Sequence, residues 1–332
     1  MQTHKPGALR NRIQLLCKML CIGALTGAAA SSYAQAYPSK PINFIVQYAA
    51  GSGADQLARV AGDAIARESS ASFVIRNMPG ALAVVGTSAL VKSPSDGYTI
   101  GICSASINSS ANALFKTLPY DIIKDFTFIE PLAVYTYVLS SAPELGYKSV
   151  DDLTAAAKAS PGKLSYAYAN ATAQVLAAVL VKQLGIQALP VPYKASGESL
   201  ADLSENRVSF AVTDMGVTVP MIKANKIKAL TVIAAKRSAN LPDVPSLVEA
   251  GKPAVEVIAW AGICGPKNMP QESVTWLRNQ IQKARAKNEV LEKFMLLGLD
   301  PLSLGNESFT DFVARQLPLW TDAAREAGIK AQ

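Results

Sequence analysis

Histidine is nearly absent from the sequence, and its scarcity removes several kinds of chemistry. The 332 residues include one histidine, His4, close to the start of the chain. A Ser-His-Asp or Cys-His mechanism therefore has no imidazole base in the rest of the chain, and a histidine-ligated metal site is equally excluded there. No G-x-S-x-G segment is present either. Only a hydrolase with a Ser-Lys pair or paired acids stays open, with Lys194 and Asp214 as its candidates.

Cysteine is also scarce, with four residues in the chain. Cys17 and Cys21 lie near the N-terminus, and the residues before Cys21 are not the small ones that a lipid-attachment site requires. Cys103 and Cys264 each end a similar apolar run, "TIGIC" and "WAGIC". Two thiols alone cannot make a structural zinc site. In an oxidising compartment they could form a disulfide, or each could stay buried as a free thiol.

Acidic residues are absent before Asp55, whereas this part of the chain carries basic residues and a short apolar run. The basic residues before position 19 are Lys5, Arg10, Arg12 and Lys18. The apolar run Met19–Ala30 follows, and Ala34 and Ala36 then form the A-x-A arrangement of a signal-peptide cleavage site. The run is too short to span a bilayer. We therefore expect residues 1–36 to be a signal peptide cleaved after Ala36, and the protein to be exported.

Dense patches of one charge are absent from the remaining sequence. Removing 36 of the 332 residues leaves 296, which is enough for two lobes with their own cores. Removing four basic charges lowers the formal net charge from +7 to +3. A mildly basic protein suits an anionic small ligand and does not have the charge pattern of a nucleic-acid binder. We expect a monomer with no nucleic-acid partner and no cofactor.

Short β-like runs alternate with stretches of helical periodicity after residue 37. One apolar stripe at helical spacing covers Leu57 to Ile65, a second runs from Ala173 to Leu184, and a third is expected to end at Pro318. This alternation predicts an α/β fold with largely parallel sheets. The expected strands are Ile42–Gln47, Phe73–Asn77, Tyr98–Cys103, Phe128–Ser140, Leu164–Ala169, Leu189–Tyr193, Val208–Thr213, Lys228–Ala234 and Ile258–Gly265.

One run, Phe128–Ala142, is long for a single strand. A strand of that length can leave one sheet and enter another, so we interpret it as a first crossover between two lobes. The second crossover is expected in the proline-rich loop after Lys228–Ala234. This predicts a discontinuous lobe 1 (residues 37–135 and 255–332), an inserted lobe 2 (residues 136–254) and a cleft between them.

The segment "YAAGSGADQLAR", residues 48–59, lies between an expected strand and an expected helix. Free N–H groups at the start of a helix favour an anion, and small side chains let the anion approach the backbone. A dinucleotide-binding loop is not indicated, because the third glycine of G-x-G-x-x-G is replaced by Gln56. No Gly-Lys-Ser/Thr follows, so a phosphate-binding Walker A loop is excluded as well. The segment therefore predicts a site for an anion other than a nucleotide.

Seven segments between residues 37 and 251 resemble one protein family, and the match runs over nearly all of residues 37–330. They read "YPSKPINFIVQYAAGSGAD", "SDGYTI", "LPYDIIKDFTFI", "GKLSYAYANATA", "VPYKASGESLADL", "MIKANKIKALTVIAAKR" and "LPDVPSLVEAG". In order and spacing they resemble the solute-binding proteins of tripartite tricarboxylate transporters, the Bug-type receptors. The resemblance implies a type II periplasmic binding protein fold whose two lobes hold a small carboxylate and deliver it to the transporter's membrane subunits, with no enzymatic activity. A receptor that signals to a sensor kinase would share this fold, so that alternative stays open.

The resemblance also assigns binding roles to positions of this sequence. In the family, a ligand carboxylate is held by bridging waters and by backbone N–H groups of the first loop, which corresponds to residues 47–55 here. Loops after later strands add contacts. Asp55 is expected to cap or orient the loop without touching the anion, since like charges repel. Helix capping is the alternative role for the later positions. The implied ligand-binding residues are Tyr48, Ala50, Gly51, Ser52, Gly53, Ala54, Asp55, Ser104, Ser106, Asn108, Tyr168, Asn170, Thr172, Ala173 and Asp214.

Departures from the family pattern favour a ligand that carries a ring. Tyr48 replaces the usual phenylalanine, and Tyr168 stands where small residues are usual. The stretch Pro79–Gly86 is bulkier and more apolar than its glycine-rich counterpart in the family. An aromatic mono- or dicarboxylate such as terephthalate is therefore expected, ahead of an aliphatic di- or tricarboxylate or an acidic amino acid. Packing of Tyr168 in the core of its lobe is an equally supported alternative.

Overall fold

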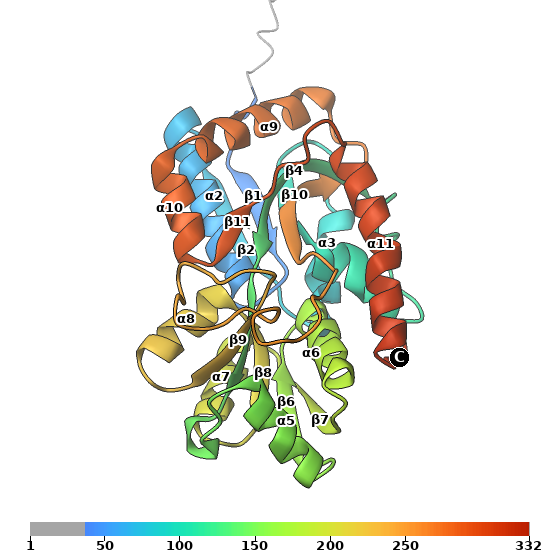
Figure 1. Ribbon diagram of the computed structural model, residues 1–332. Helices are drawn as coiled ribbons and strands as arrows, with labels where there is room; N and C mark the ends of the chain where they lie inside the picture. Colours follow the sequence, from blue (N-terminus) through green and yellow to red (C-terminus); the bar gives the residue numbers. More distant parts are fainter. Residues whose placement is uncertain (1–36, 332) are drawn as a thin grey trace, which may run out of the picture. The chain divides into compact units, whose positions relative to one another are not determined.

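The computed structural model describes residues 37–331, and the residues from Lys40 onward form one compact unit (Figure 1). The predicted signal peptide, residues 1–36, lies outside the described residues. Within the described part of the chain, no helix combines the length and the apolar character needed to cross a bilayer.

The first of two sheets has six strands. They are β1 (Ile42–Val46), β2 (Phe73–Asn77), β3 (Thr99–Ser104), β4 (Phe126–Tyr135), β10 (Trp260–Pro266) and β11 (Leu299–Pro301), in the spatial order β11-β4-β10-β3-β1-β2. The helical segments from the same parts of the chain are α2 (Gly53–Ser69), η1 (Ala81–Ala83), α3 (Val84–Val91), η2 (Ser106–Ser110), α4 (Ala111–Leu114), α9 (Gln271–Arg285), α10 (Asn288–Leu296) and α11 (Phe309–Glu326). In Figure 1 this sheet occupies the upper half of the compact unit.

The second sheet has five strands and occupies the lower half of the same unit (Figure 1). They are β5 (Tyr137–Ser141), β6 (Leu164–Tyr168), β7 (Ala188–Pro192), β8 (Phe210–Asp214) and β9 (Lys228–Ile233), in the order β7-β6-β8-β5-β9. The accompanying helical segments are η3 (Pro143–Leu145), α5 (Val150–Ala159), α6 (Ala171–Gln183), α7 (Ser196–Ser204) and α8 (Met215–Lys223).

The predicted α/β class is confirmed, but both sheets are mixed and not largely parallel. In the first sheet β1 is parallel to β2 and β3, whereas β10 is antiparallel to β3 and β4. In the second sheet β6 is parallel to β7 and β8, whereas β5 is antiparallel to β8 and β9. Each antiparallel pair includes β4, β5 or β10, the strands that border the chain's passages between the sheets. The parallel pairs come from strand–helix–strand units, whose connections must return the chain to the same edge.

The chain passes from the first sheet to the second almost without interruption. β4 ends at Tyr135 and β5 begins at Tyr137, so a single residue, Thr136, separates strands of different sheets. The return runs through residues 234–259 to β10. The expected long run Phe128–Ala142 therefore consists of two strands, and it places the two tyrosines at the junction of the sheets. The lobe boundaries at 135/136 and 254/255 stay a prediction.

Two helices show how sequence and packing together set the boundaries. The α2 helix begins at Ser52, whose side chain accepts a hydrogen bond from the Asp55 N–H at 3.3 Å, as helix-capping serines do. The α11 helix was expected to stop at Pro318, but it continues to Glu326. Proline costs one backbone hydrogen bond inside a helix, and the buried Trp320 beyond it provides packing that offsets this loss.

Candidate functional site

A cavity lies between the two sheets, and many of the residues expected at the site line it. Its free space is about 560 Å³, including the part open to solvent, which is within the range of small-molecule sites. Both sheets contribute, the first through β3, β4 and β10 and the second through β5 and β8. The expected residues that line this inter-sheet cavity are Tyr48, Ser52, Gly53, Ala54, Ser104, Ser106, Asn170, Thr172 and Asp214.

Four helices begin at the wall of the inter-sheet cavity. They are α2, α6, α7 and α8, and each contributes its capping residue to the lining. These capping residues are Ser52, Asn170, Ala195 and Asp214. The first turn of a helix has backbone N–H groups without helical partners and a partial positive charge of about half a unit. Four such ends at one cavity create a positive field without any basic side chain.

Charged side chains are few at this cavity. Within the described lining, Lys194 is the one basic residue and Asp214 the one acidic residue. Lys194 is exposed, whereas Asp214 is buried with 5 % of its surface accessible. Burial raises the pKa of Asp214 to about 6, and the backbone N–H groups of Val217 and of Asp214 itself offset this only partly. The cavity therefore attracts anions mainly through helix ends.

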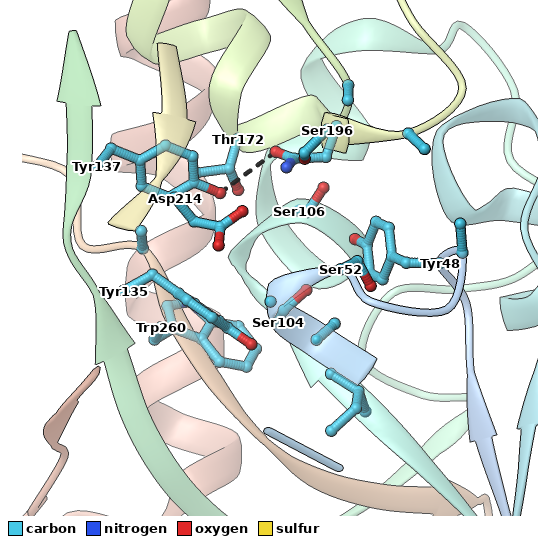
Figure 2. Close-up of a pocket in the computed structure, with 18 of the residues that line it drawn as sticks. Tyr48, Ser52, Ser104, Ser106, Tyr135, Tyr137, Thr172, Ser196, Asp214 and Trp260 are labelled. Carbon is cyan, nitrogen blue, oxygen red and sulfur yellow. Dashed lines mark hydrogen bonds between the residues drawn. The ribbon is translucent and has the colours of Figure 1, made fainter. Parts of the chain in front are cut away.

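Several buried polar atoms of the cavity wall lack a hydrogen-bond partner among the described residues. Figure 2 shows side chains of this group around one common space, with Asp214 on one side and Tyr48 and Ser104 on the other. A buried polar group without a partner costs about 1–3 kcal/mol, so a cluster of them calls for an explanation. The atoms are Tyr48 Oη, Ser104 Oγ, Tyr135 Oη, Asp214 Oδ1 and Trp260 Nε1.

The three tyrosines of the wall are hydrogen-bond donors at neutral pH. Burial raises the pKa of Tyr135 and Tyr137 well above the usual value, and the Asp214 carboxylate adds to the effect on both. Burial also raises the pKa of Tyr48, although the nearby hydroxyls of Ser104 and Ser106 counteract it without making hydrogen bonds of good geometry. Together with the Trp260 indole N–H, the unpartnered hydroxyls of Tyr48 and Tyr135 can donate to an acceptor in the cavity.

One hydrogen bond joins the two parts of the wall. Ser106, at the start of η2, accepts a bond from the Ala171 N–H at 3.1 Å, and Ala171 is the first residue of α6. The Tyr137 hydroxyl donates to Asn170 Oδ1 at 3.3 Å next to it. Because η2 follows a strand of the first sheet and α6 follows a strand of the second, the Ser106 bond holds the two sheets together across the cavity.

Asp55 stabilises the first loop from outside the lining. It is 2 % exposed and accepts hydrogen bonds from the Gly51 N–H and from Asn77 Nδ2, both at 2.9 Å. It also pairs with Arg59 at 3.0 Å. Burial raises the pKa of Asp55, but the bonds from Arg59, Gly51 and Asn77 outweigh this and lower it. These contacts fix the loop that ends at the start of α2.

Other expected site residues also lie outside the lining, for local reasons. Both polar atoms of the fully buried Asn108 side chain are used, since Oδ1 accepts from the Ser104 N–H at 3.3 Å and Nδ2 donates to the Ile122 carbonyl at 2.9 Å. The Tyr168 ring packs on Tyr166, with the ring centres 6.2 Å apart. The whole set outside the lining is Ala50, Gly51, Asp55, Asn108, Tyr168 and Ala173.

The structure adds lining residues that the sequence reasoning missed. Tyr135 and Tyr137 had a usable signal, because they lie in the run that was expected to cross between lobes. Ser196 and Lys194 follow β7 at the start of α7, the same strand-to-helix position as the expected loops. Small apolar residues carried no such signal. The added residues are Ala49, Ile102, Tyr135, Tyr137, Ala169, Lys194, Ala195, Ser196, Ala259 and Trp260.

Metal ligands do not gather here. The described residues contain no group of three or more histidine, cysteine, aspartate or glutamate side chains that could hold a metal ion. Cys103 and Cys264 are buried free thiols on the neighbouring strands β3 and β10.

Comparison with known proteins identifies what the chain is similar to. The profile of a family described as "Tripartite tricarboxylate transporter family receptor" (TctC) matches residues 57–329. The chain is 29 % identical to Protein BugT of Bordetella pertussis over 323 residues, which are 96 % of this chain and 99 % of that protein.

Solved structures give the same result. The chain is similar to Rpa4515 of R. palustris, determined with adipate, at a TM-score of 0.86 and 28 % identity, covering 89 % of this chain and all of that one. It is similar to the periplasmic binding protein BugD at a TM-score of 0.83 and 28 % identity, with the same coverage. These matches confirm the predicted type II periplasmic binding protein fold.

Proposed function

Because the chain belongs to the TctC family of tripartite tricarboxylate transporter receptors, we propose that it captures a small carboxylate in the inter-sheet cavity and delivers it to the membrane subunits of such a transporter. The family consists of binding proteins and not of enzymes, so the hydrolase alternative is set aside. The likeness to periplasmic binding proteins supports action in the periplasm.

The convergence of four helix N-termini on one cavity carries this proposal. A carboxylate at the start of α2 would accept hydrogen bonds from backbone N–H groups, each contributing roughly 1.5–3 kcal/mol net because the acceptor is charged. The unpartnered hydroxyls of Tyr48 and Tyr135 and the Trp260 N–H would supply further donors. Lys194 at the edge of the lining would attract the ligand or pair with a second carboxylate.

An aromatic mono- or dicarboxylate, such as terephthalate, is the ligand class that we favour. Four aromatic side chains line the cavity, namely Tyr48, Tyr135, Tyr137 and Trp260. Ring stacking adds about 0.5–1.5 kcal/mol per pair beyond the burial of area. Tyr168 does not belong to this group, because its ring packs on Tyr166 outside the lining. The relative determined with adipate supports a dicarboxylate more generally.

Binding would proceed by closure of the two sheets on the ligand. The carboxylate first docks at the α2 end on the first sheet. The α6 end on the second sheet then closes over it, with hinges at Thr136 and in residues 234–259, where the chain passes between the sheets. The bond between Ser106 and Ala171 forms only when the two parts meet, so it would favour the closed form that holds the ligand.

A thermal-shift screen of the protein without residues 1–36 tests the proposal. Terephthalate, benzoate, adipate, citrate and glutamate form the panel, because a ligand that binds only the folded state raises the melting temperature. We expect a rise with at least one carboxylate, largest for an aromatic one. No rise with any small carboxylate would refute carboxylate capture.

A pair of variants tests the preference for a ring by calorimetry. Tyr48→Leu should lower the ratio of aromatic to aliphatic affinity by about twofold to tenfold, the factor that corresponds to one lost ring contact. Tyr168→Leu removes a ring of the same kind outside the lining and should leave the ratio unchanged. An unchanged ratio in both variants would remove aromatic stacking at Tyr48 from the mechanism.

A further inference from the structure

Asp214 occupies an unusual place for an acid in a cavity that attracts anions. It is the last residue of β8 and the capping residue of α8, and it pairs across the sheet with Tyr137. Its Oδ1 atom lies 2.5 Å from the position that a Cβ atom on Gly53 would occupy. Gly53 is the first residue of α2. The carboxylate of Asp214 thus lies against the helix end where the ligand carboxylate is proposed to bind.

Among the described residues, no basic side chain offsets the charge of Asp214, although backbone N–H groups at the start of α8 stabilise the carboxylate in part. The titratable groups that face it are the hydroxyls of Tyr135 on β4 and Tyr137 on β5, which are uncharged at neutral pH. Tyr48, the third tyrosine of the lining, is equally uncharged. Among the described residues, no basic side chain forms an ion pair with Asp214, and Oδ1 has no hydrogen-bond partner. Lys194, the one basic residue of the described lining, is exposed and makes no ion pair with Asp214.

We propose that Asp214 takes up one proton when a carboxylate binds beside it, so that ligand capture is coupled to protonation of the receptor. The inference rests on the proposed function of the cavity. The proton comes from solvent and binds to a carboxylate oxygen of Asp214. The resulting O–H then donates a hydrogen bond to an oxygen of the ligand carboxylate, and a repulsive pair of anions becomes a hydrogen-bonded pair with one charge.

Two physical effects act in the same direction. Burial already raises the pKa of Asp214 to about 6 before ligand binds. A second carboxylate in the same cavity raises it further, as in paired acids that share one proton. Between the pKa of the free protein and the higher pKa of the complex, affinity should fall about tenfold for each unit of rising pH, because each binding event must take one proton from solution.

Calorimetry in buffers of different ionisation enthalpy counts the protons directly. Terephthalate and adipate serve as probes and are titrated from pH 5 to pH 8. Their own carboxyl groups change protonation least at the upper end of this range, so the proton count is clearest there. We expect uptake near one proton at pH 7.5, and a steady loss of affinity as the pH rises above about 6. Asp63→Asn removes the same charge from the exposed face of α2 and should retain both properties.

Asp214→Asn gives the decisive comparison. It should bind without proton uptake and with affinity independent of pH, and it should bind more tightly than the unmodified protein at pH 8. Tight binding by the unmodified protein with no proton uptake at pH 7.5 would overturn the inference while leaving carboxylate capture intact. The inference would also be overturned if a ligand with an amino group bound without proton uptake and no longer bound to Asp214→Asn. Asp214 would then be the counter-ion of the ligand's ammonium group. Failure of every carboxylate to bind would instead refute the proposed function, and this inference with it.

Discussion

Gly53→Ala should weaken ligand binding strongly while adding only one methyl group. The new Cβ atom would lie 2.5 Å from Asp214 Oδ1, 3.0 Å from Asp214 Cγ and 3.3 Å from Tyr135 Cε1. The first separation is too short for a real contact and the other two are tight, so Asp214 must move. Space for that movement exists on the side of the inter-sheet cavity, which is where the ligand carboxylate is proposed to lie.

The size of the effect follows from this geometry. Extra methyl groups in a packed site cost about 1–3 kcal/mol, and here the displaced carboxylate relaxes into the cavity when no ligand is bound. The free energy of unfolding should therefore fall by less than about 1 kcal/mol, helped by alanine's better helix propensity. Carboxylate affinity should fall about tenfold to a hundredfold, which corresponds to roughly 1.4–2.7 kcal/mol.

Calorimetric titration with a carboxylate found in the screen measures this loss, and Gly197→Ala is the matched control. Gly197 lies in the first turn of α7, another helix that begins at the cavity, but a Cβ atom there meets nothing within 4 Å. The control should bind within about twofold of the unmodified protein. If Gly53→Ala bound equally well while folding normally, the ligand would not lie at the start of α2.

Four further predictions use buried or half-buried groups of the same fold. Ser106→Ala should lower carboxylate affinity by about 5- to 150-fold in calorimetry, since the N–H at the start of α6 loses its acceptor at a cost of about 1–3 kcal/mol. Ser104→Ala, whose hydroxyl has no partner in the described structure, should leave the ligand-free melting temperature unchanged, and a clear drop would contradict this. Asp214→Asn should raise the free energy of unfolding at pH 7 by roughly 2–3 kcal/mol in urea unfolding, because it removes a buried carboxylate. The pKa of Asp214 is about 6 in the folded protein against an ordinary 3.8, so the stability contribution of this one group is fully present below about pH 4 and is lost as the pH rises through 6. Arg285→Met should lower the free energy of unfolding by about 3 kcal/mol in the same measurement, because it leaves the half-buried Glu130 with one ion-pair partner fewer. A loss no larger than that caused by replacing an exposed arginine with methionine would refute this prediction.

The positions of the site loops were predictable because they follow a local rule. Small residues and hydroxyls that come directly after a β-like run mark the start of a helix, and Ser52 and Asn170 both cap helices at the cavity. That pattern depends only on neighbours in the chain, so the sequence contains it in full. The same rule applies to Ser196, which follows β7 at the start of α7 and lines the cavity although it was not among the predicted site residues.

Side-chain direction was not predictable in the same way. Tyr168 and Tyr137 both lie at ends of strands in the second sheet, yet Tyr168 packs on Tyr166 whereas Tyr137 lines the cavity. In a strand a shift of one residue turns a side chain to the opposite face, so the direction depends on strand pairing. Asn108 is a similar case, because its partner Ile122 is brought to it only by folding.

The sequence by itself determined the α/β class, the family, the loops that cap helices and the lack of imidazole chemistry, since composition, periodicity and local capping are properties of neighbouring residues. Only the tertiary structure decided which of those loops meet. It placed Asp214 of the second sheet against Gly53 of the first, and it joined Ser106 to Ala171. These pairs are more than 60 positions apart in the chain, and contact between them depends on how the two sheets pack around the cavity.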